Sequence, residues 1–506
     1  MTNELLWFAV FLQILMGGSD TLLHHEFTEK LAWAPSAKQE LKLHAARNFI
    51  YAGLFGAFAW GIPYGFWASV AILFIVAEVL ITLWDFVEED LSRKLPATER
   101  VLHTLLALNY GAILILLLPE LWSLSEKATD YSYINYGIGS IALTIAAIGV
   151  FLFGLRDYFA AVRLERFIKA PANELASNLK PKQHILITGA TGFIGRRLSR
   201  ALIENGHSLI VYTRNPEKAA HLGAPIKIIT SLDQIKDDDP IDAVINLAGE
   251  PLATGLWTKA KKQKILQSRE QIADEIYGLC HRLYVPPKTV IAASAIGWYG
   301  LRGDETLKET SAPKPCFTHE VCQRVEEKNN RLKEFKCRTV NLRIGLVLGT
   351  EGGILANLLV PFEYGGGGPI GDGKHWMSWI TRDDLVRLIV HCLKTEGLSG
   401  AVNAVAPHPV RNEEFTKMLG VSLNRPSIVR MPASLLKLAL GDFAKELLLA
   451  SQHVDNNKII ETGFQFKAPA LKEAFEQILP TKKTTTEFTN RSQQYHFKNT
   501  PGNSKL

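Results

Sequence analysis

The sequence predicts a two-part fold: an all-α membrane bundle, then an α/β domain with a doubly wound parallel sheet and a small α+β domain after it. Two observations predict this division. Three long segments without Asp, Glu, Lys or Arg all lie before residue 160, at 48–77, 101–119 and 131–155. After residue 180 the charges are scattered, and a glycine-rich turn begins an alternation of apolar segments typical of strands and helices.

The chain of 506 residues is long enough for about three domains. The expected parts are a transmembrane domain at 1–160, a linker at 161–183, a cofactor-binding domain at 184–410, a small C-terminal domain at 411–480 and a disordered tail at 481–506. The tail is expected to be disordered because it lacks an apolar period.

Five membrane-spanning helices are expected, since about 20 apolar residues cross the hydrocarbon core as a helix. Their ranges are 4–19, 47–62, 65–85, 101–120 and 132–155. The uncharged segment at 48–77 is too long for one crossing and contains GIPYG at 61–65, so we expect a tight hairpin there. The first span lacks the basic leader and cleavage site of a signal peptide, so we expect it to be retained.

The positions of lysine and arginine predict the orientation. They gather in the loops 20–47 and 86–100 and again after residue 155, whereas GIPYG has none and the loop 120–131 has only Lys127. This bias places the N-terminus outside and the long C-terminal part in the cytoplasm. We therefore expect an integral membrane protein, of a bacterial inner membrane, that contacts the lipid bilayer.

The charge and the cysteines exclude other classes of protein. The membrane bias accounts for the net charge of +6, and no basic patch is interleaved with aromatic residues, so no nucleic-acid partner is expected. The five cysteines form no CxxC pair, and a reducing compartment favours buried thiols over disulfides or a zinc site.

The membrane part contains a tandem repeat. DTLLHHEFTEKL at 20–31 matches DFVEEDLSRKL at 85–95 with a gap of one residue. Each copy is followed by a proline and then by Glu-x-x-x-His and a tyrosine; the two sets are Glu40, His44, Tyr51 and Glu99, His103, Tyr110. Two-span repeats of the same orientation predict a pseudo-two-fold axis along the membrane normal.

The repeat brings histidines and carboxylates to the cytoplasmic edge. Such a set suits a dinuclear iron or manganese site, or a haem held between two histidines. The alternative is a belt of hydrated, mutually paired polar groups. The candidate ligands are His24, His25, His44, Glu88, Glu99 and His103. Glu78 lies inside a predicted span, where a carboxylate marks function or pairing.

The segment 184–216 predicts a nucleotide-cofactor site. Gly189, Gly192 and Gly195 follow an apolar strand and open a helix, and a second strand completes the unit. This arrangement lets the backbone approach a pyrophosphate at the helix N-terminus, as in the Rossmann fold. The predicted cofactor contacts are Gly189, Thr191, Gly192, Phe193, Ile194, Gly195, Thr213, Arg214, Asn246, Leu247, Ala248 and Gly249.

Arg214, at the end of the second strand, predicts the choice of cofactor. An acidic residue there would hold the ribose hydroxyl of NAD. A guanidinium instead matches the 2′-phosphate of NADP, so NADP is favoured over NAD. The alternative for Arg214 is a solvated surface arginine.

Several motifs carry a family resemblance. They are ITGATGFIG (187–195), DAVINLAGEPL (242–252), SAIGWYG (294–300), RIGLVLGTEGGIL (343–355), GGGGPIGDGKHWMSWITRDDL (365–385) and NAVAPHPVRNEEF (403–415). Over about 184–480 the chain resembles the atypical extended short-chain dehydrogenase/reductases, in the epimerase-family branch that has its own C-terminal domain. The resemblance implies that residues 246–249 lie under the cofactor and that Ser294 takes the position of the catalytic serine.

The chain departs from that family at the catalytic Tyr-x-x-x-Lys. Thr318 and Cys322 occupy the two positions, and neither can do the original chemistry. Candidate replacements are Tyr299, His319 and Glu320, and the alternatives are a packing tyrosine and residues exposed at a helix start. Glu250 is a candidate for contact with substrate. Arg343 is either a clamp for a substrate anion or part of a salt bridge at the strand end.

Three functions remain open. The first is a membrane-anchored NADP-dependent oxidoreductase or epimerase that acts on a sugar nucleotide or another small polar substrate. The second is a catalytically degenerate, NADP(H)-binding regulatory protein, with a link to cell division. The third is a redox protein that passes NADPH electrons to a metal centre in the membrane domain. The sequence does not determine the oligomeric state.

Overall fold

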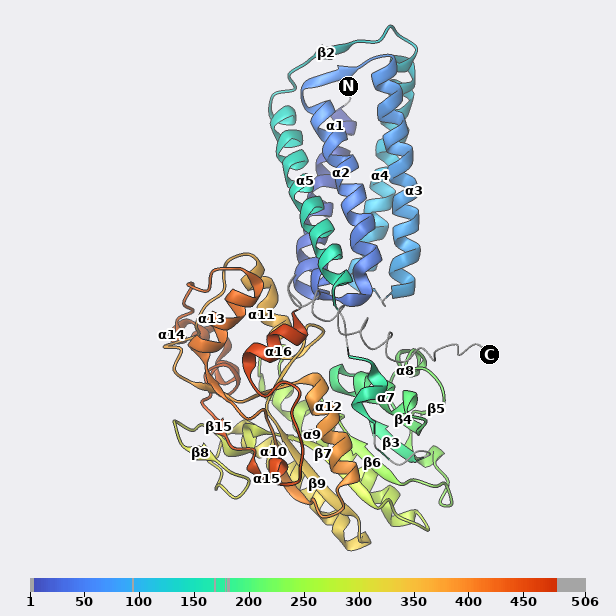
Figure 1. Ribbon diagram of the computed structural model, residues 1–506. Coiled ribbons are helices and arrows are strands. Elements are labelled where there is room, and N and C mark those ends of the chain that lie inside the picture. The colour runs from blue at the N-terminus through green and yellow to red at the C-terminus, as the bar shows by residue number, and fades with distance from the viewer. Residues whose placement is uncertain (1–3, 93–94, 168–169, 178, 180–182, 480–506) are drawn as a thin grey trace, which may run out of the picture. The chain divides into compact units, whose positions relative to one another are not determined.

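The computed structural model describes the chain except residues 1–3, 93–94, 168–169, 178, 180–182 and 480–506 (Figure 1). The predicted tail at 481–506 therefore lies outside the described residues. The chain divides into two compact units, residues 1–168 and 169–506, each with its own core. The first is all-helical apart from two short strands, and the second contains a parallel sheet.

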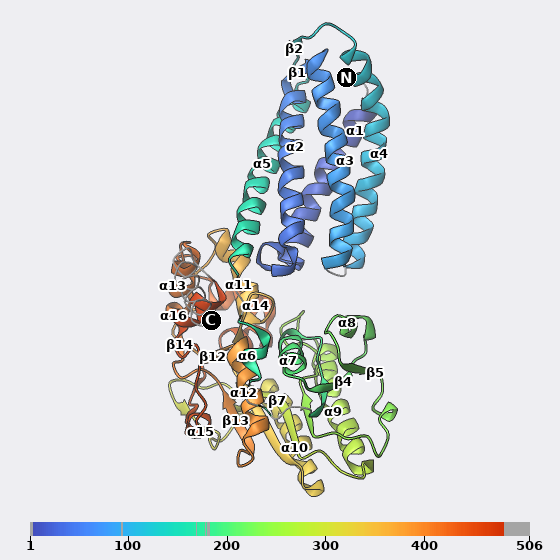
Figure 2. The same ribbon diagram turned by 45° about the vertical axis from the view of Figure 1, so that its right-hand side comes forward.

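Five long helices form the N-terminal unit. They are α1 (Glu4–Asp20), α2 (Lys38–Trp60), α3 (Phe66–Ser92), α4 (Ala97–Ser125) and α5 (Ile138–Glu165). Helix α2 packs between α5 and α3, and α4 packs against α1 and α3 (Figures 1 and 2). The predicted hairpin at 61–65 joins α2 to α3, and there β1 (Gly61–Pro63) pairs antiparallel with β2 (Tyr131–Tyr133).

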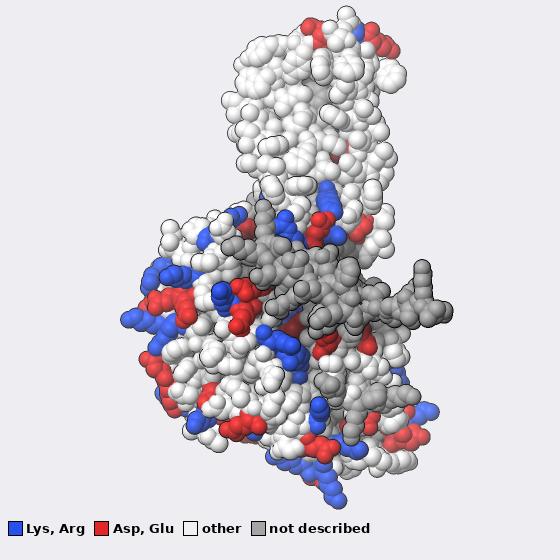
Figure 3. Space-filling model, in the orientation of Figure 1, with Lys and Arg blue, Asp and Glu red and all other residues white. Residues whose placement is uncertain are grey.

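The surface of this bundle is largely apolar. On the face shown in Figure 3, charged side chains gather at the two ends of the bundle. By length and composition alone, four segments among the described residues could cross a membrane: Glu4–Thr28, Phe66–Leu91, Ala97–Ser125 and Ile138–Glu165. Helix α2, which covers residues 47–60 of the second predicted span, is not among them; its first ten residues include Lys38, Glu40, Lys42 and Arg47.

The C-terminal unit is built on a parallel sheet of seven strands in the order β13-β9-β7-β6-β3-β4-β5. The strands are β3 (His184–Thr188), β4 (Ser208–Tyr212), β5 (Ile226–Ile229), β6 (Ala243–Asn246), β7 (Thr289–Ala295), β9 (Arg338–Ile344) and β13 (Gly400–Ala404). The order reverses at β3, so the chain winds outward in both directions from it. This confirms the predicted doubly wound fold.

Alternation along the strands explains why helices cover both faces of the sheet. Ile185 and Ile187 of β3 pack with α7 (Phe193–Glu204) and α12 (Arg382–Lys394), whereas Leu186 packs in a second core with α9 (Lys259–Arg282). Successive side chains of a strand point to opposite faces, so a strand buried on both sides must be apolar throughout. Helix α10 (Phe317–Arg331) packs against α9 and β7.

A small region follows the sheet. Its helices are α13 (Asn412–Leu423), α14 (Ala433–Leu440), α15 (Asn457–Glu461) and α16 (Leu471–Ile478). Phe415 of α13 and Phe475 of α16 are buried against each other with ring centroids 5.4 Å apart. Two short strand pairs complete it: β11 (Trp376–Met377) with β14 (Val410–Arg411), and β15 (His453–Val454) with β8 (Thr306–Leu307).

Candidate cofactor site

The turn between β3 and α7 has the geometry of a phosphate-binding loop. Gly189 has a φ of +70°, and a Cβ there would lie 2.7 Å from the backbone of Leu247. A Cβ on Gly195 would overlap the carbonyl oxygen of Gly189. Glycine is therefore required at both positions, and the first amides of α7 have no intrahelical partner, as at any helix N-terminus.

Gly192 has a different reason to be glycine. A Cβ there would have one neighbour, the Gly189 carbonyl oxygen at 3.3 Å. Its φ of −78° is open to any residue. The fold does not need glycine at 192, whereas close approach of a pyrophosphate to the backbone does.

The ring of Phe193 closes one side of this turn. Gly349 and Gly352 make room for it, since a Cβ on either would lie within 2.7 Å of the ring. The guanidinium of Arg382 lies 5.1 Å from the ring centroid. Phe193 is thereby fixed, and with it the first turn of α7, whose next residues are Ile194 and Gly195.

The end of β6 lies beside the turn. The Thr188 hydroxyl donates to Asn246 Oδ1 (2.6 Å), and the amide of Leu247 donates to the Thr188 carbonyl (3.1 Å). Gly249 lies against the guanidinium of Arg269, so closely that a Cβ would be 2.8 Å from Cζ. The structure thus brings residues 246–249 and Gly189 together.

Arg214 is exposed at the end of β4. Its guanidinium forms no hydrogen bond or ion pair with any residue that the structure describes. Beside it, the Thr213 hydroxyl accepts from the amide of Asn215 (3.1 Å), which begins helix α8 (Pro216–Ala220). Arg214 is therefore available to a ligand, although a solvated surface arginine would have the same surroundings.

The position of the catalytic serine is part of a buried network. Ser294, on β7, donates to Glu326 Oε1 (2.8 Å). Glu326 receives two hydrogen bonds from Arg343, each of 2.9 Å, and both residues are less than 5% exposed. Of the two alternatives for Arg343, the structure contains the salt bridge. Thr318 and Cys322 are buried on the same helix, α10.

Tyr299 belongs to this network. It is 0% exposed, its hydroxyl donates to Asn403 Oδ1 (2.6 Å) and it accepts from Arg343 Nη1 (3.3 Å). Burial raises the pKa of Tyr299 to about 12. This geometry favours the packing alternative for Tyr299, because a proton donor must reach its substrate and have a lowered pKa.

The remaining predicted residues are divided between the interior and the surface. His319 is buried, and its Nδ1 lies 2.8 Å from the carbonyl of Trp298. Glu320 forms an exposed ion pair with Arg324 (2.6 Å). Glu250 accepts from Lys261 (2.8 Å), and this hydrogen bond lowers the pKa of its carboxyl.

Sequence reasoning missed Arg269. Its Nη1 donates to the carbonyls of Glu250 and Ile265, and burial lowers its pKa. It places a cationic group at Gly249, where the resemblance puts the cofactor. No motif in the sequence marks it, since it is one basic residue among several on α9.

The predicted metal ligands are in the N-terminal unit. His25, Glu99 and His103 converge with Asp20, and His25 and His44 converge with Glu89. His24 instead contacts Asp20 Oδ1 (2.8 Å) and Thr98 (3.2 Å), and Glu88 is outside both groups. All the converging residues except His103 are buried, so the groups are not a hydrated belt, but their members are paired with one another as that alternative expects: His103 Nε2 lies 3.0 Å from Asp20 Oδ2 and His44 Nε2 lies 3.1 Å from Asp85 Oδ2.

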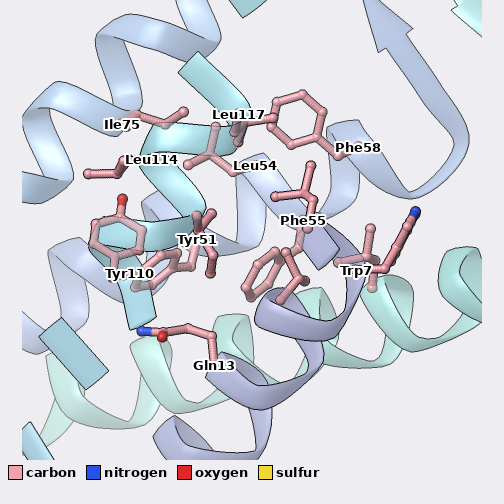
Figure 4. Close-up of a pocket in the computed structure, with 14 residues that line it drawn as sticks. Trp7, Gln13, Tyr51, Leu54, Phe55, Phe58, Ile75, Tyr110, Leu114 and Leu117 are labelled. Carbon is pink, nitrogen blue, oxygen red and sulfur yellow. The ribbon is translucent and has the colours of Figure 1, made fainter. Parts of the chain in front are cut away.

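An apolar pocket lies inside the same helix bundle (Figure 4). Tyr51 and Tyr110, the equivalent tyrosines of the two repeats, both line it, and their ring centroids are 6.3 Å apart. Tyr51 donates to Glu78 Oε1 (2.6 Å), as does Thr82 (2.7 Å). Glu78 Oε1 is therefore hydrogen-bonded by two hydroxyls, whereas its Oε2 is buried without a hydrogen-bond partner among the described residues.

The parallel sheet, its glycine turn and the α7 N-terminus define a Rossmann-type, dinucleotide-binding class of protein. The profile of the NAD dependent epimerase/dehydratase family matches residues 185–404, and a domain of unknown function, DUF1731, matches residues 431–478. The chain belongs to this epimerase family. Its N-terminal unit lies outside both matches.

Individual proteins of the epimerase family are similar to this chain over about 60% of its length. The chain is 36% identical over 315 residues to the chloroplastic epimerase family protein SDR39U1 homolog of Arabidopsis thaliana, covering 60% of this chain and 89% of that protein. It is 33% identical over 304 residues to the epimerase family protein YfhF of Bacillus subtilis, covering 60% and 99%. The crystal structure of human epimerase family protein SDR39U1 (isoform 2) with NADPH superposes with a TM-score of 0.54 at 28% identity, covering 59% of this chain and 99% of that one.

Proposed function

We propose that this protein is a membrane-anchored, NADP(H)-dependent oxidoreductase or epimerase that acts on a sugar nucleotide or another small polar substrate. The observation that carries the cofactor assignment is the human relative, whose structure was determined with NADPH and which this chain matches over 99% of its length. The glycine turn and the unpaired Arg214 of this chain supply the groups that NADP(H) requires.

The bound cofactor would supply or accept a hydride at its nicotinamide ring. The amides of residues 193–195 would hold the pyrophosphate, which the missing side chain of Gly192 would let approach, and Arg214 would pair with the 2′-phosphate. Ser294 would donate its hydroxyl proton to a substrate oxygen. In the structure the Ser294 hydroxyl donates its hydrogen bond to Glu326 Oε1, which also accepts from Arg343 Nε, so Oε1 would keep one hydrogen bond when the hydroxyl turns to the substrate oxygen. We assign Tyr299 a positioning role through Arg343, and Glu250 a contact with the substrate.

Membrane anchoring has support in composition. Four helical segments of the N-terminal unit have the length and hydropathy of membrane spans, and large apolar side chains such as Leu80, Ile115 and Ile145 are more than 60% exposed on them. A water-soluble bundle would not present so much apolar surface. The lysine and arginine bias of the loops supports an outside N-terminus.

Loss of the Arg214 guanidinium should change the cofactor preference. We expect Arg214→Ala to weaken NADPH binding by about 10- to 100-fold, because a charge-assisted hydrogen bond contributes about 1.5–3 kcal/mol. NADH binding should change by less than about threefold, since NADH has no 2′-phosphate. Isothermal titration of the detergent-solubilised full chain with both cofactors measures this. Equal losses for NADPH and NADH would contradict the assignment of Arg214.

One observation favours a second function. With Thr318 and Cys322 in place of tyrosine and lysine, the described network contains no exposed proton donor. A protein with this site could bind NADP(H) and regulate a membrane process without turnover.

Ser294→Ala distinguishes the two functions. If the protein is an enzyme, we expect turnover of uridine diphosphate sugars, followed as NADPH consumption and as epimer formation, to fall by about 100-fold or more. NADPH affinity should stay unchanged, because the Ser294 hydroxyl donates to Glu326 and not to the cofactor turn. Tight NADPH binding by the wild type with no turnover of any acceptor would instead support the regulatory protein.

A further inference from the structure

Two overlapping groups of histidines and carboxylates lie inside the N-terminal unit. In the first group, the ligand atoms of Asp20, His25, Glu99 and His103 all lie within 4.8 Å of one another. Asp20 is 5%, His25 7% and Glu99 0% exposed, so these groups are withdrawn from water. Buried charged groups need partners of opposite charge or a bound cation.

The distances within the first group fit a metal ion. Asp20 Oδ2 lies 3.0 Å from His103 Nε2 and 3.4 Å from His25 Nε2, and Glu99 Oε1 lies 3.8 Å from His25 Nε2. Bonds of about 2.1 Å to one ion place donor atoms about 3.0 Å apart in octahedral and about 3.4 Å apart in tetrahedral geometry. The four donors therefore need only small shifts to share one ion.

Buried ring nitrogens point to a missing ligand. Among the described residues, His25 Nε2 and His44 Nε2 are buried and within ion-pair distance of carboxylates, Asp20 at 3.4 Å and Asp85 at 3.1 Å, but neither nitrogen makes a hydrogen bond of acceptable geometry. A buried polar atom without a hydrogen bond is costly unless something else binds it. An ion between the carboxylates and the rings would satisfy His25 Nε2.

Residues around the group hold its members in place. His24 Nδ1 lies 2.8 Å from Asp20 Oδ1, which leaves Oδ2 facing the two histidines. The other ring nitrogen of His103, Nδ1, lies 3.3 Å from Glu89 Oε2. This is an ion-pair distance, and a carboxylate beside the second ring nitrogen is common for a histidine that binds a metal.

The repeat explains why the group forms. Asp20 of the first copy contacts His103 of the second, and Asp85 of the second contacts His44 of the first (3.1 Å), as a two-fold axis requires. The one-residue gap between the copies coincides with a π-helix at Thr21–Thr28, where the amide of Glu29 donates to the carbonyl of His24. His25 lies within this π-helix, and π-helical turns are frequent at functional sites.

We propose that the N-terminal unit binds a divalent transition-metal ion through Asp20, His25, Glu99 and His103. Two imidazoles and two carboxylates suit manganese, iron or zinc, whereas magnesium and calcium prefer oxygen ligands throughout. All four residues belong to the N-terminal unit, whereas the residues of the cofactor turn belong to the C-terminal unit.

Elemental analysis of the full-length protein, produced in medium supplemented with manganese, iron and zinc, tests this proposal. We expect about one ion per chain in the wild type and less than about 0.1 in Asp20→Asn and His103→Gln. Glu78→Gln is the matched control, since it neutralises another buried carboxylate of the same bundle and should keep the metal. A wild type without metal, or ligand variants that keep a full complement, would overturn the proposal.

Cobalt titration tests the wild-type protein directly, so its main result does not depend on whether a variant folds. Chelator-treated wild type should bind Co²⁺ with visible absorption bands that differ from those of the aqueous ion, and the bands should be absent in Asp20→Asn. Histidine and carboxylate ligands change the Co²⁺ spectrum because they replace water in its coordination shell. A spectrum identical to that of free Co²⁺ with the wild type would contradict the site.

Discussion

Replacement of Gly195 by alanine is expected to abolish tight cofactor binding and to destabilise the C-terminal unit. The new Cβ would overlap the carbonyl oxygen of Gly189, a backbone atom with no rotamer by which to move away. Either α7 or the turn must therefore shift. Overpacking of this kind costs about 1–3 kcal/mol of stability. Loss of one or two hydrogen bonds to the pyrophosphate makes NADPH binding about 100-fold weaker.

Substitutions at two other glycines separate the loss of cofactor binding from the loss of stability. Gly192→Ala adds a Cβ whose one neighbour is 3.3 Å away, so we expect weaker NADPH binding with little change in stability. Gly278→Ala, on α9, adds a Cβ with nothing within 4 Å and should leave binding unchanged. Isothermal titration with NADPH and thermal unfolding of the full chain measure the two effects. A Gly195→Ala protein that binds NADPH like the wild type would refute the cofactor turn.

Sequence reasoning predicted the features that depend on residues close together in the chain. The spacing of Gly189, Gly192 and Gly195 identified the turn. Whether a Cβ fits at each of these positions depends on backbone nearby in the turn or in the adjacent strand end, so the glycine pattern itself reports the geometry. The uncharged segments identified the helices of the bundle for a similar reason, since length and composition are local properties. The repeat at 20–31 and 85–95 also placed His25, Glu99 and His103 together.

Sequence reasoning did not predict the contacts between residues that are far apart in the chain. The chain separates Ser294 from Glu326 by 32 positions and Glu326 from Arg343 by 17, and no periodicity links them. The sheet brings Ser294 and Arg343 into register on β7 and β9, and α10 supplies the carboxylate. The same limit applies to Arg269. The sequence also did not show what the one-residue gap between the repeats does to the backbone. The structure shows a π-helix at that place, Thr21–Thr28.

The second large effect is expected at the pair Glu326–Arg343. Glu326→Ala removes the carboxylate that receives both hydrogen bonds from Arg343, a residue 3% exposed. A buried cation is left without its counter-charge, and loss of one partner of such a pair costs about 3–5 kcal/mol. Ser294 and Tyr299 also lose their fixed positions, because Arg343 joins them through the same network.

Hydrogen exchange of the full chain in increasing urea measures this cost through peptides from 289–344, which cover β7 and β9. We expect these peptides to lose protection at a clearly lower urea concentration in Glu326→Ala. Glu320→Ala, which breaks the exposed pair with Arg324 on the same helix, should change stability by about 0–1 kcal/mol at most. The double variant Glu326→Leu with Arg343→Met should recover much of the loss, because apolar residues of similar size replace a buried ion pair at little cost. If Glu326→Ala were no less stable than Glu320→Ala, the network would not hold the carboxyl ends of β7 and β9 in place, and the role proposed for Ser294 would lose its structural basis.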